Sequence, residues 1–205
     1  MGKVVLELSM SLDGFVAGPN DSPELPLGEG GDSLFKWYSS GDTEFPLPGT
    51  PMVFKVSRAS AELLRDEWSQ IGAMVAGRRM FDIANAWQGN PPGGKNCFIV
   101  THNPPHEWIK PGSPFTFVTD GVESAIAKAK KVAGNLNVSA ASASIAQQAI
   151  KAGLLDEIQI DLIPVLLGGG VGLFEHLGAK MPIELESTRV VSTPDVTHLW
   201  FRVIK

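Results

Sequence analysis

The sequence predicts an α/β protein with a mixed, mostly parallel sheet and helices on both faces. Apolar runs of strand length alternate with segments of helical spacing through most of the 205 residues, and this alternation favours parallel strands. Near the C-terminus, residues 183–192 and 196–204 instead alternate apolar and polar side chains around a turn at 193–195. That pattern is typical of an antiparallel hairpin, so the sheet is expected to be mixed.

The first elements are expected in the order strand, long loop, helix, strand. An apolar run at 3–10 predicts the first strand. Residues 11–54 are rich in Gly, Pro, Ser and Asp, so we expect a functional loop that contains one short helix at 33–38. Serine caps and apolar spacing predict a helix at 57–69, and the apolar run 71–77 predicts a buried strand directly after it.

The middle of the chain continues the alternation. Helical spacing returns at 78–87, and strands are expected at 97–101 and 115–119. The helix after them has apolar residues on one face from Val122 onward, and Gly134 is suited to end it.

The next elements complete the alternating pattern before the hairpin. A strand is expected at 136–139 and a helix at 143–152, where Ser144 and Gln147 have the spacing of a capping box. A long apolar run at 157–167 then predicts one more strand.

Composition excludes several classes of function. The net charge of −5 and the scattered basic residues leave no broad positive field for nucleic acid. A single cysteine, Cys97, excludes an intrachain disulfide and a multi-cysteine zinc site, and it fits a reducing, cytoplasmic compartment. No segment approaches the roughly 20 apolar residues that span a bilayer. We expect one soluble domain over 1–205, without a metal site.

The end of the first strand carries the first candidate for chemistry, because ligands of α/β sheets bind beyond the carboxyl ends of strands. Asp13 lies there, beside Gly14 and the long loop. Its carboxylate could bind a hydroxyl group, supply a proton, or only hydrogen-bond its own turn.

Two arginines open the helix that follows strand 71–77. Arg78 and Arg79 oppose the helix dipole, which suggests a compensating anion such as a phosphate. In the alternative interpretation, Arg78 pairs with Asp82 one turn on and Arg79 is merely solvated. His102, just past another strand end, could also meet a phosphate.

The segment 138–144 could bind a phosphate through backbone N–H groups at a helix start. The segment lacks the glycine that would let a phosphate approach the backbone most closely. The turn therefore either avoids positive φ angles or binds the phosphate less well. A turn of small packing residues is the alternative.

Four glycines between 168 and 172 interrupt the last apolar run. Their spacing matches neither a dinucleotide fingerprint nor a phosphate-binding P-loop. They form either a structural turn before a short helix or a place where another group approaches the main chain.

Taken together, these motifs resemble the dihydrofolate reductase-like family, which includes the C-terminal reductase domain of riboflavin biosynthesis. The similarity covers nearly the whole chain. Its most specific part is "AGLLDEIQIDLIPVLLGGGVGLFE" at 152–175, followed by "GRRMFD" at 77–82. The remaining matching stretches lie at 11–18, 98–102, 137–151 and 196–203.

The resemblance implies a three-layer α/β/α fold, NADPH as cofactor, a small pterin-like or pyrimidine-like substrate and a homodimer. By position, it places the cofactor phosphates at Gly77, Arg78 and Arg79. The other implied cofactor contacts are Thr101 and His102 at the adenosine 2′-phosphate, Ala140, Ala141, Ser142 and Ser144 at the pyrophosphate, and Pro164, Leu166 and Gly168 near the nicotinamide.

On the substrate side, the resemblance places Asp13 in the cleft, where it is our candidate for orienting the substrate or supplying a proton. Asp32 is the nearest choice for a buried carboxylate of the loop helix. Phe35 and Trp37 could stack on a flat ring, or anchor the core.

Two departures from the family pattern bear on cofactor binding. Met80 stands where relatives usually have Thr, and Ala140-Ala141 stands where they have a glycine pair. A non-catalytic or flavin-binding or nucleotide-binding protein that keeps the fold is therefore the alternative function.

Overall fold

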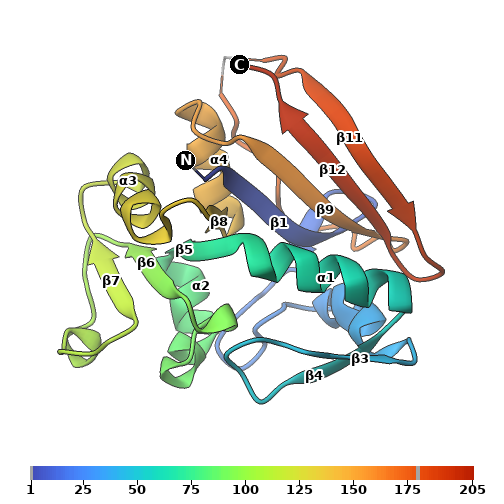
Figure 1. Ribbon diagram of the computed structural model, residues 1–205, viewed down its shortest axis with the longest axis horizontal. Coiled ribbons are helices and arrows are strands. Elements are labelled where there is room, and N and C mark those ends of the chain that lie inside the picture. The colour runs from blue at the N-terminus through green and yellow to red at the C-terminus, as the bar shows by residue number, and fades with distance from the viewer. Residues whose placement is uncertain (1, 179–180) are drawn as a thin grey trace.

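A computed structural model describes residues 2–178 and 181–205, and its centre is an eight-stranded sheet (Figure 1). The outer two strands on one side run antiparallel to their neighbours, and the other six are parallel. The predicted mixed, mostly parallel sheet is confirmed. In spatial order the strands are β11 (Leu185–Ser192), β12 (Thr197–Val203), β9 (Glu157–Ile163), β1 (Val4–Ser11), β8 (Asn137–Ala140), β5 (Ile71–Gly77), β6 (Asn96–Val100) and β7 (Phe115–Val118).

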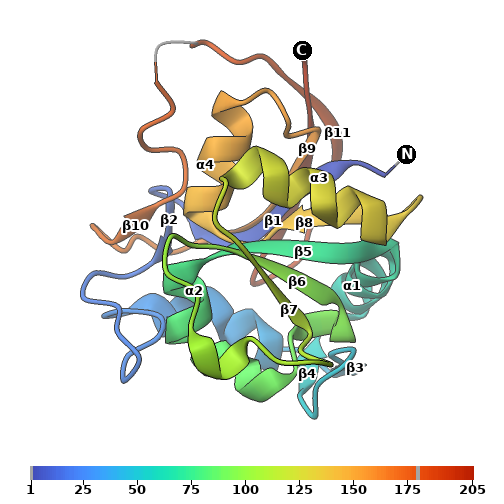
Figure 2. The same ribbon diagram turned by 90° about the vertical axis from the view of Figure 1, so that its left-hand side faces the viewer.

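Helices cover both faces of the sheet, as predicted (Figure 2). One face packs against α3 (Val122–Ala133) and α4 (Ala143–Lys151). The opposite face packs against α1 (Arg58–Gln70), α2 (Arg78–Ile83) and the 3-10 helix η1 (Gly31–Ser39). Further 3-10 turns are η2 (Asn85–Gly89), η3 (Pro92–Gly94) and η4 (His106–Trp108).

Alternation along β1 divides its side chains between these two faces, because successive residues of a strand point to opposite sides. Val4 and Leu6 belong to the apolar core beneath α3 and α4. Val5 packs with the α2 side, and Glu7 and Ser9 line a cavity on that same face. One strand therefore contributes both to a closed core and to an open site.

Local signals fix the start of α1 and its direct passage into β5. Ser57 caps the helix, and its Oγ accepts a hydrogen bond from the Ser60 N–H at 3.1 Å. The helix ends at Gln70, and the next residue, Ile71, has an extended backbone and opens β5 without a loop.

The polar segment 11–54 contains more structure than the sequence predicts. The short helix is present as η1, but β2 (Phe15–Ala17) and a hairpin of β3 (Thr43–Pro46) with β4 (Val53–Val56) flank it. These strands have three or four residues each, too few for a recognisable alternation.

Two predicted elements are shorter than expected. The helix predicted at 78–87 ends at Ile83, because residues 85–88 have positive φ angles that no right-handed helix can include. The strand predicted at 157–167 ends at Ile163, because Pro164 has no N–H for the ladder. The chain then leaves the sheet and forms β10 (Val171–Gly172), which pairs with β2 where a short helix was an alternative.

The capping box predicted at Ser144 is wrong. Helix α4 begins two residues earlier than that motif requires, with Ser142 rather than Ser144 at the N-cap position. The Gln147 amide instead donates to the backbone oxygens of Gly172 at 3.0 Å and Leu173 at 3.1 Å. Gln147 therefore connects α4 to the end of the glycine-rich segment.

Within the part of the chain that the structure describes, no helix is both long and apolar enough to cross a membrane.

Candidate functional site

A cavity of about 590 Å³ lies on the sheet face that carries α1, α2 and η1. Its size falls in the range of small-molecule sites. The walls are largely aromatic and aliphatic, with Phe35 from η1, Phe54 from β4, Trp68 from α1, Met80 from α2 and Trp87 from η2. Such walls suit a flat, mainly apolar ring.

Two acidic side chains, Glu7 of β1 and Asp161 of β9, interrupt the apolar lining. Burial, reinforced by the charge of Asp161, raises the pKa of Glu7 to about 8, although a hydrogen bond with Glu67 lowers it. Burial and the same carboxylates also raise the pKa of Tyr38, which lines the cavity beside them. The raised pKa suits Glu7 to act as an acid near neutral pH.

Behind the cavity, Asp161 is held by a buried polar chain. The Nδ1 atom of His198 lies 2.6 Å from Asp161 Oδ1, and its Nε2 atom lies 2.9 Å from Ser60 Oγ. Although the residue types are those of a hydrolase triad, the Ser60 residue is only 1% exposed and has no access to a substrate. The hydrogen bonds through His198 therefore fix the orientation of Asp161.

The predicted cofactor residues at the two helix starts come together in the fold. The Gly77 N–H, before α2, donates to Ser142 Oγ, before α4, at 3.2 Å. A Cβ atom at Gly77 would lie 2.9 Å from Ser144 Oγ, so glycine is required for this approach. The ends of β5 and β8 thus form one junction, which we call the α2–α4 junction.

Both arginines of α2 have carboxylate partners. Arg78 Nε donates to Asp82 Oδ1 at 2.8 Å, as the alternative interpretation expected. Arg79 is not merely solvated, because its Nε donates to Asp21 Oδ2 at 2.9 Å. That hydrogen bond and the charge of Asp21 raise the pKa of Arg79 further. A phosphate at α2 would therefore compete with two carboxylates.

The loop after β6 lies against the first of these arginines. The Arg78 guanidinium donates to the backbone oxygen of Asn103. The Thr101 hydroxyl is buried and accepts from the Asn103 N–H at 3.2 Å, whereas His102 is exposed. This contact brings the predicted 2′-phosphate residues beside the start of α2.

The turn at Ala140-Ala141 avoids positive φ, which decides between the two possibilities that the sequence leaves open. Neither alanine has a left-handed backbone, and the Ala141 N–H donates to the Val75 oxygen at 2.9 Å. Both alanines are buried, so their side chains pack beneath the junction.

The Asp13 carboxylate stabilises the glycine-rich segment. It accepts from Ser11 Oγ at 2.6 Å, from the Leu167 N–H at 3.1 Å and from the Gly168 N–H at 2.7 Å. The hydrogen bond from Ser11, assisted by these amides, lowers the pKa of Asp13. An ionised acceptor fits its third predicted role, turn stabilisation, and is a poor proton donor.

The glycine-rich segment presents one side to solvent. Pro164, Leu166 and Gly168 are exposed, while Val165 and Leu167 pack against the core cluster near η1. At Gly170, φ is +129° and a Cβ atom would lie 2.0 Å from the Ala17 oxygen. Here the main chain at Gly170 passes so close to the end of β2 that a side chain would not fit.

The three predicted substrate contacts lie in three different environments. Phe35 lines the cavity. Trp37 is 2% exposed and anchors the core, with its indole N–H 3.3 Å from Ser9 Oγ. The Asp32 side chain is 73% exposed and 4.0 Å from Lys36, so it is not the buried carboxylate.

Sequence reasoning missed the acids that do face the cavity. Glu7 interrupts the apolar start of β1, and Asp161 continues the alternation of Glu157 and Gln159 along β9. An acid within a strand was the signal that could have identified both. Across residues 2–178 and 181–205, no group of three His, Cys, Asp or Glu side chains is placed to hold a metal ion.

Comparisons with known proteins agree with this architecture. The family model of the RibD C-terminal domain matches residues 2–199. The uncharacterized protein YwjB of Bacillus subtilis (strain 168) is 23% identical over 188 residues, which cover 91% of this chain and 91% of that protein.

Two solved structures share the fold. A protein from Shewanella sp. PV-4 that is provisionally assigned to riboflavin biosynthesis has a TM-score of 0.71 at 19% identity, over 100% of both chains. Dihydrofolate reductase from Enterococcus faecalis, complexed with NADP(H), has a TM-score of 0.59 at 14% identity, over 100% of this chain and 98% of that chain. With the family model matched from residue 2 to residue 199, this chain belongs to the RibD C-terminal domain family.

Proposed function

We propose that this protein is a reductase that uses NADPH to reduce a small, flat heterocycle of the pterin or pyrimidine type. The observation that carries the proposal is the apolar cavity of about 590 Å³ with the acid Glu7, whose pKa is raised, in its lining. A flat ring fits such walls, and reduction of a C=N bond requires a proton donor beside it.

The α2–α4 junction fits a dinucleotide. Gly77 leaves space beside Ser144 that a Cβ atom would fill. Ser142 makes no side-chain cap to α4, so the first amides of that helix stay free for a phosphate. Ala140 and Ala141 shape the turn, and Arg78 and Arg79 would exchange their carboxylate partners for phosphate oxygens.

The remaining proposed contacts follow the same surface. Thr101 and His102 would meet the 2′-phosphate, which favours NADPH over NADH. Pro164, Leu166 and Gly168 offer an exposed edge for the nicotinamide. When bound, NADPH supplies the hydride. The chain itself holds the ring, excludes water with its aromatic walls and donates the proton from Glu7.

The relatives support this proposal. The chain belongs to the RibD C-terminal domain family, and the dihydrofolate reductase with the same fold was solved with NADP(H). We include a homodimer in the proposal because β11 is an edge strand whose side chains are mostly exposed.

Titration with NADPH, followed by nicotinamide fluorescence, tests the cofactor. We expect saturation at micromolar concentrations and at least tenfold weaker binding of NADH, and unchanged fluorescence at millimolar NADPH would contradict the proposal. Turnover is then followed at 340 nm with 7,8-dihydrofolate, 7,8-dihydropterin and 5-amino-6-(5-phosphoribosylamino)uracil. Binding without oxidation of NADPH by any of the three would favour the non-catalytic alternative.

A further inference from the structure

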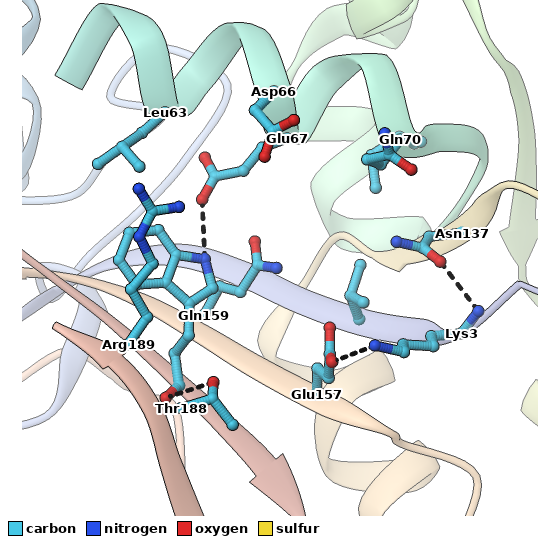
Figure 3. A pocket seen from close by; sticks show the side chains of 13 residues that line it. Lys3, Leu63, Asp66, Glu67, Gln70, Asn137, Glu157, Gln159, Thr188 and Arg189 are labelled. Carbon is cyan, nitrogen blue, oxygen red and sulfur yellow. Dashed lines mark hydrogen bonds and ion pairs between the residues drawn. The ribbon is translucent and has the colours of Figure 1, made fainter. Parts of the chain in front are cut away.

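A second, more polar cleft of about 300 Å³ lies on the same face of the sheet, nearer the C-terminal hairpin (Figure 3). It opens between α1 and the strands β9, β12 and β11. Lys3 and Glu157 pair at 2.5 Å on one side of it, and Asp66 and Gln70 of α1 line another. Charged and amide side chains of this kind hold water, so the cleft is a path for solvent toward the sheet.

Glu67 lines this cleft from α1, the helix that also borders the apolar cavity. Figure 3 shows its side chain pointing from α1 into the cleft, toward the strands that carry Arg189 and Gln159. The Trp200 indole N–H donates to Glu67 Oε1 at 3.1 Å, and this contact fixes the carboxyl group. Trp68, the next residue of α1, lines the apolar cavity instead.

Glu67 also contacts the acid of the main cavity. It forms a hydrogen bond with Glu7, which lines the apolar cavity from β1. One carboxyl group therefore faces the solvent cleft, the other faces the proposed ring site, and the two touch. No such pair is needed for packing, since burying two acids costs free energy that an apolar pair would not.

We propose that Glu67 relays protons from water in the second cleft to Glu7, and that this pair resupplies the apolar cavity during turnover. This inference rests on the proposed reductase function. A ring bound against the aromatic walls covers Glu7 from the side of the main cavity, so its proton must be replaced from behind.

In the proposed reaction, bound NADPH would supply the hydride for the new C–H bond of the substrate C=N group and would leave as NADP⁺. The O–H bond of Glu7 breaks as the substrate nitrogen gains its N–H bond. The Glu7 carboxylate then takes the proton of Glu67, and Glu67 takes one from water in the cleft.

The surrounding charges keep protons on this pair. Burial, with the charges of Glu7 and Asp161, raises the pKa of Glu67 to about 10, while the bond from Trp200 and the Arg189 charge lower it. The charge of Asp161 also raises the pKa of Glu7. Of the other groups that face the pair, Tyr38 stays neutral.

The test compares the first turnover with later ones in Glu67→Gln. Glutamine keeps an oxygen for the Trp200 indole but carries no exchangeable acid proton. With NADPH and 7,8-dihydrofolate in rapid mixing, we expect a first turnover within about twofold of the wild type and a steady-state rate at least about 10-fold lower. Glu62→Gln is the matched control, since Glu62 is an exposed acid of the same helix that pairs with Arg58, and both its first and later turnovers should equal those of the wild type.

The outcomes separate the relay from the reductase function. Equal first and later turnovers in Glu67→Gln, both at the wild-type rate, would overturn the relay and leave the reductase intact. No NADPH oxidation by the wild type, with any of the three compounds, would overturn the function itself, and the relay with it.

A measurement on the unliganded protein provides a second test. With ¹³C-labelled glutamate carboxyl groups, NMR titration should give two signals with raised midpoints, and Glu7→Gln should lower the Glu67 midpoint. A Glu67 midpoint that does not move in Glu7→Gln would overturn the relay. If Glu67→Gln does not fold, Trp200→Phe should raise the same midpoint, because it removes the indole hydrogen bond, and an unchanged midpoint would contradict that contact.

Discussion

The two faces of the central sheet are built from the same strands, yet they bury different chemistry. Toward α3 and α4, residues such as Val4, Leu6 and Val75 meet a layer of small apolar side chains and form a closed core. Toward α1 and η1, Glu7 and Asp161 line a cavity. Because strand side chains alternate, one face can stabilise the fold while the other accepts costly buried acids.

The largest expected effect tests the closed face. Leu6→Ala removes a fully buried side chain and should lower the free energy of unfolding by about 2–5 kcal/mol. Urea denaturation measures this loss. Leu12→Ala is the control, since Leu12 is 63% exposed and should cost less than about 0.5 kcal/mol. Equal losses in the two variants would mean that this face does not carry the stability.

Glu7→Gln tests the opposite face. It should reduce the rate of NADPH-dependent reduction by about 100-fold or more, because the proton donor is lost. The free energy of unfolding should not fall, since an amide is cheaper to bury than an acid among like charges. Asp32→Asn, an exposed acid on η1, is the control and should leave the rate unchanged. If the Glu7→Gln enzyme reduced its substrate at the wild-type rate, a group other than Glu7 would be the proton donor.

The pH dependence of stability sharpens the same contrast. The pKa of Glu7 is raised from 4.5 to about 8, so between these values the folded state binds more protons than the unfolded chain. The free energy of unfolding should therefore fall as pH rises from 5 to 8, by up to about 1.4 kcal/mol per pH unit for each such acid. Denaturation of Glu7→Gln across this range should give a flatter curve, and a wild-type curve that is already flat would refute the raised pKa.

The smallest expected effect concerns the α2–α4 junction. Ser142→Ala removes the acceptor for the Gly77 N–H and should cost about 1 kcal/mol of stability. NADPH affinity should fall a few-fold in the same variant, as measured by nicotinamide fluorescence. Ser124→Ala, which removes a hydrogen bond to Asp120 outside the junction, is the control and should leave NADPH affinity unchanged. Unchanged affinity in Ser142→Ala would place the pyrophosphate elsewhere.

Much of the fold could be predicted because its signals are local. Strand β5 matches the predicted 71–77, and α3 begins at Val122 and ends before Gly134, as its spacing and stop signal indicate. The β3–β4 hairpin could not be predicted, since its pairing joins two short segments across a turn. Likewise, nothing near Ser144 in sequence shows that Gln147 turns toward Gly172.

The candidate site was less accessible to sequence reasoning. The resemblance placed Gly77 and Ser142 separately at the cofactor phosphates, and the structure brings these two residues into contact. The buried carboxylate was sought in η1 at Asp32, but the acids that meet the cavity lie in β1 and β9. The sequence of a single strand does not reveal whether an acid in it faces solvent or a buried neighbour.

By itself, the sequence determined the order of the elements and the mixed character of the sheet, because periodicity and helix stops act over a few residues. Only the tertiary structure decided that Glu7, Glu67 and Asp161 share one buried site. They meet because β1 pairs with β9 and α1 crosses the same face, and burial at that contact raises the pKa of Glu7 and of Glu67.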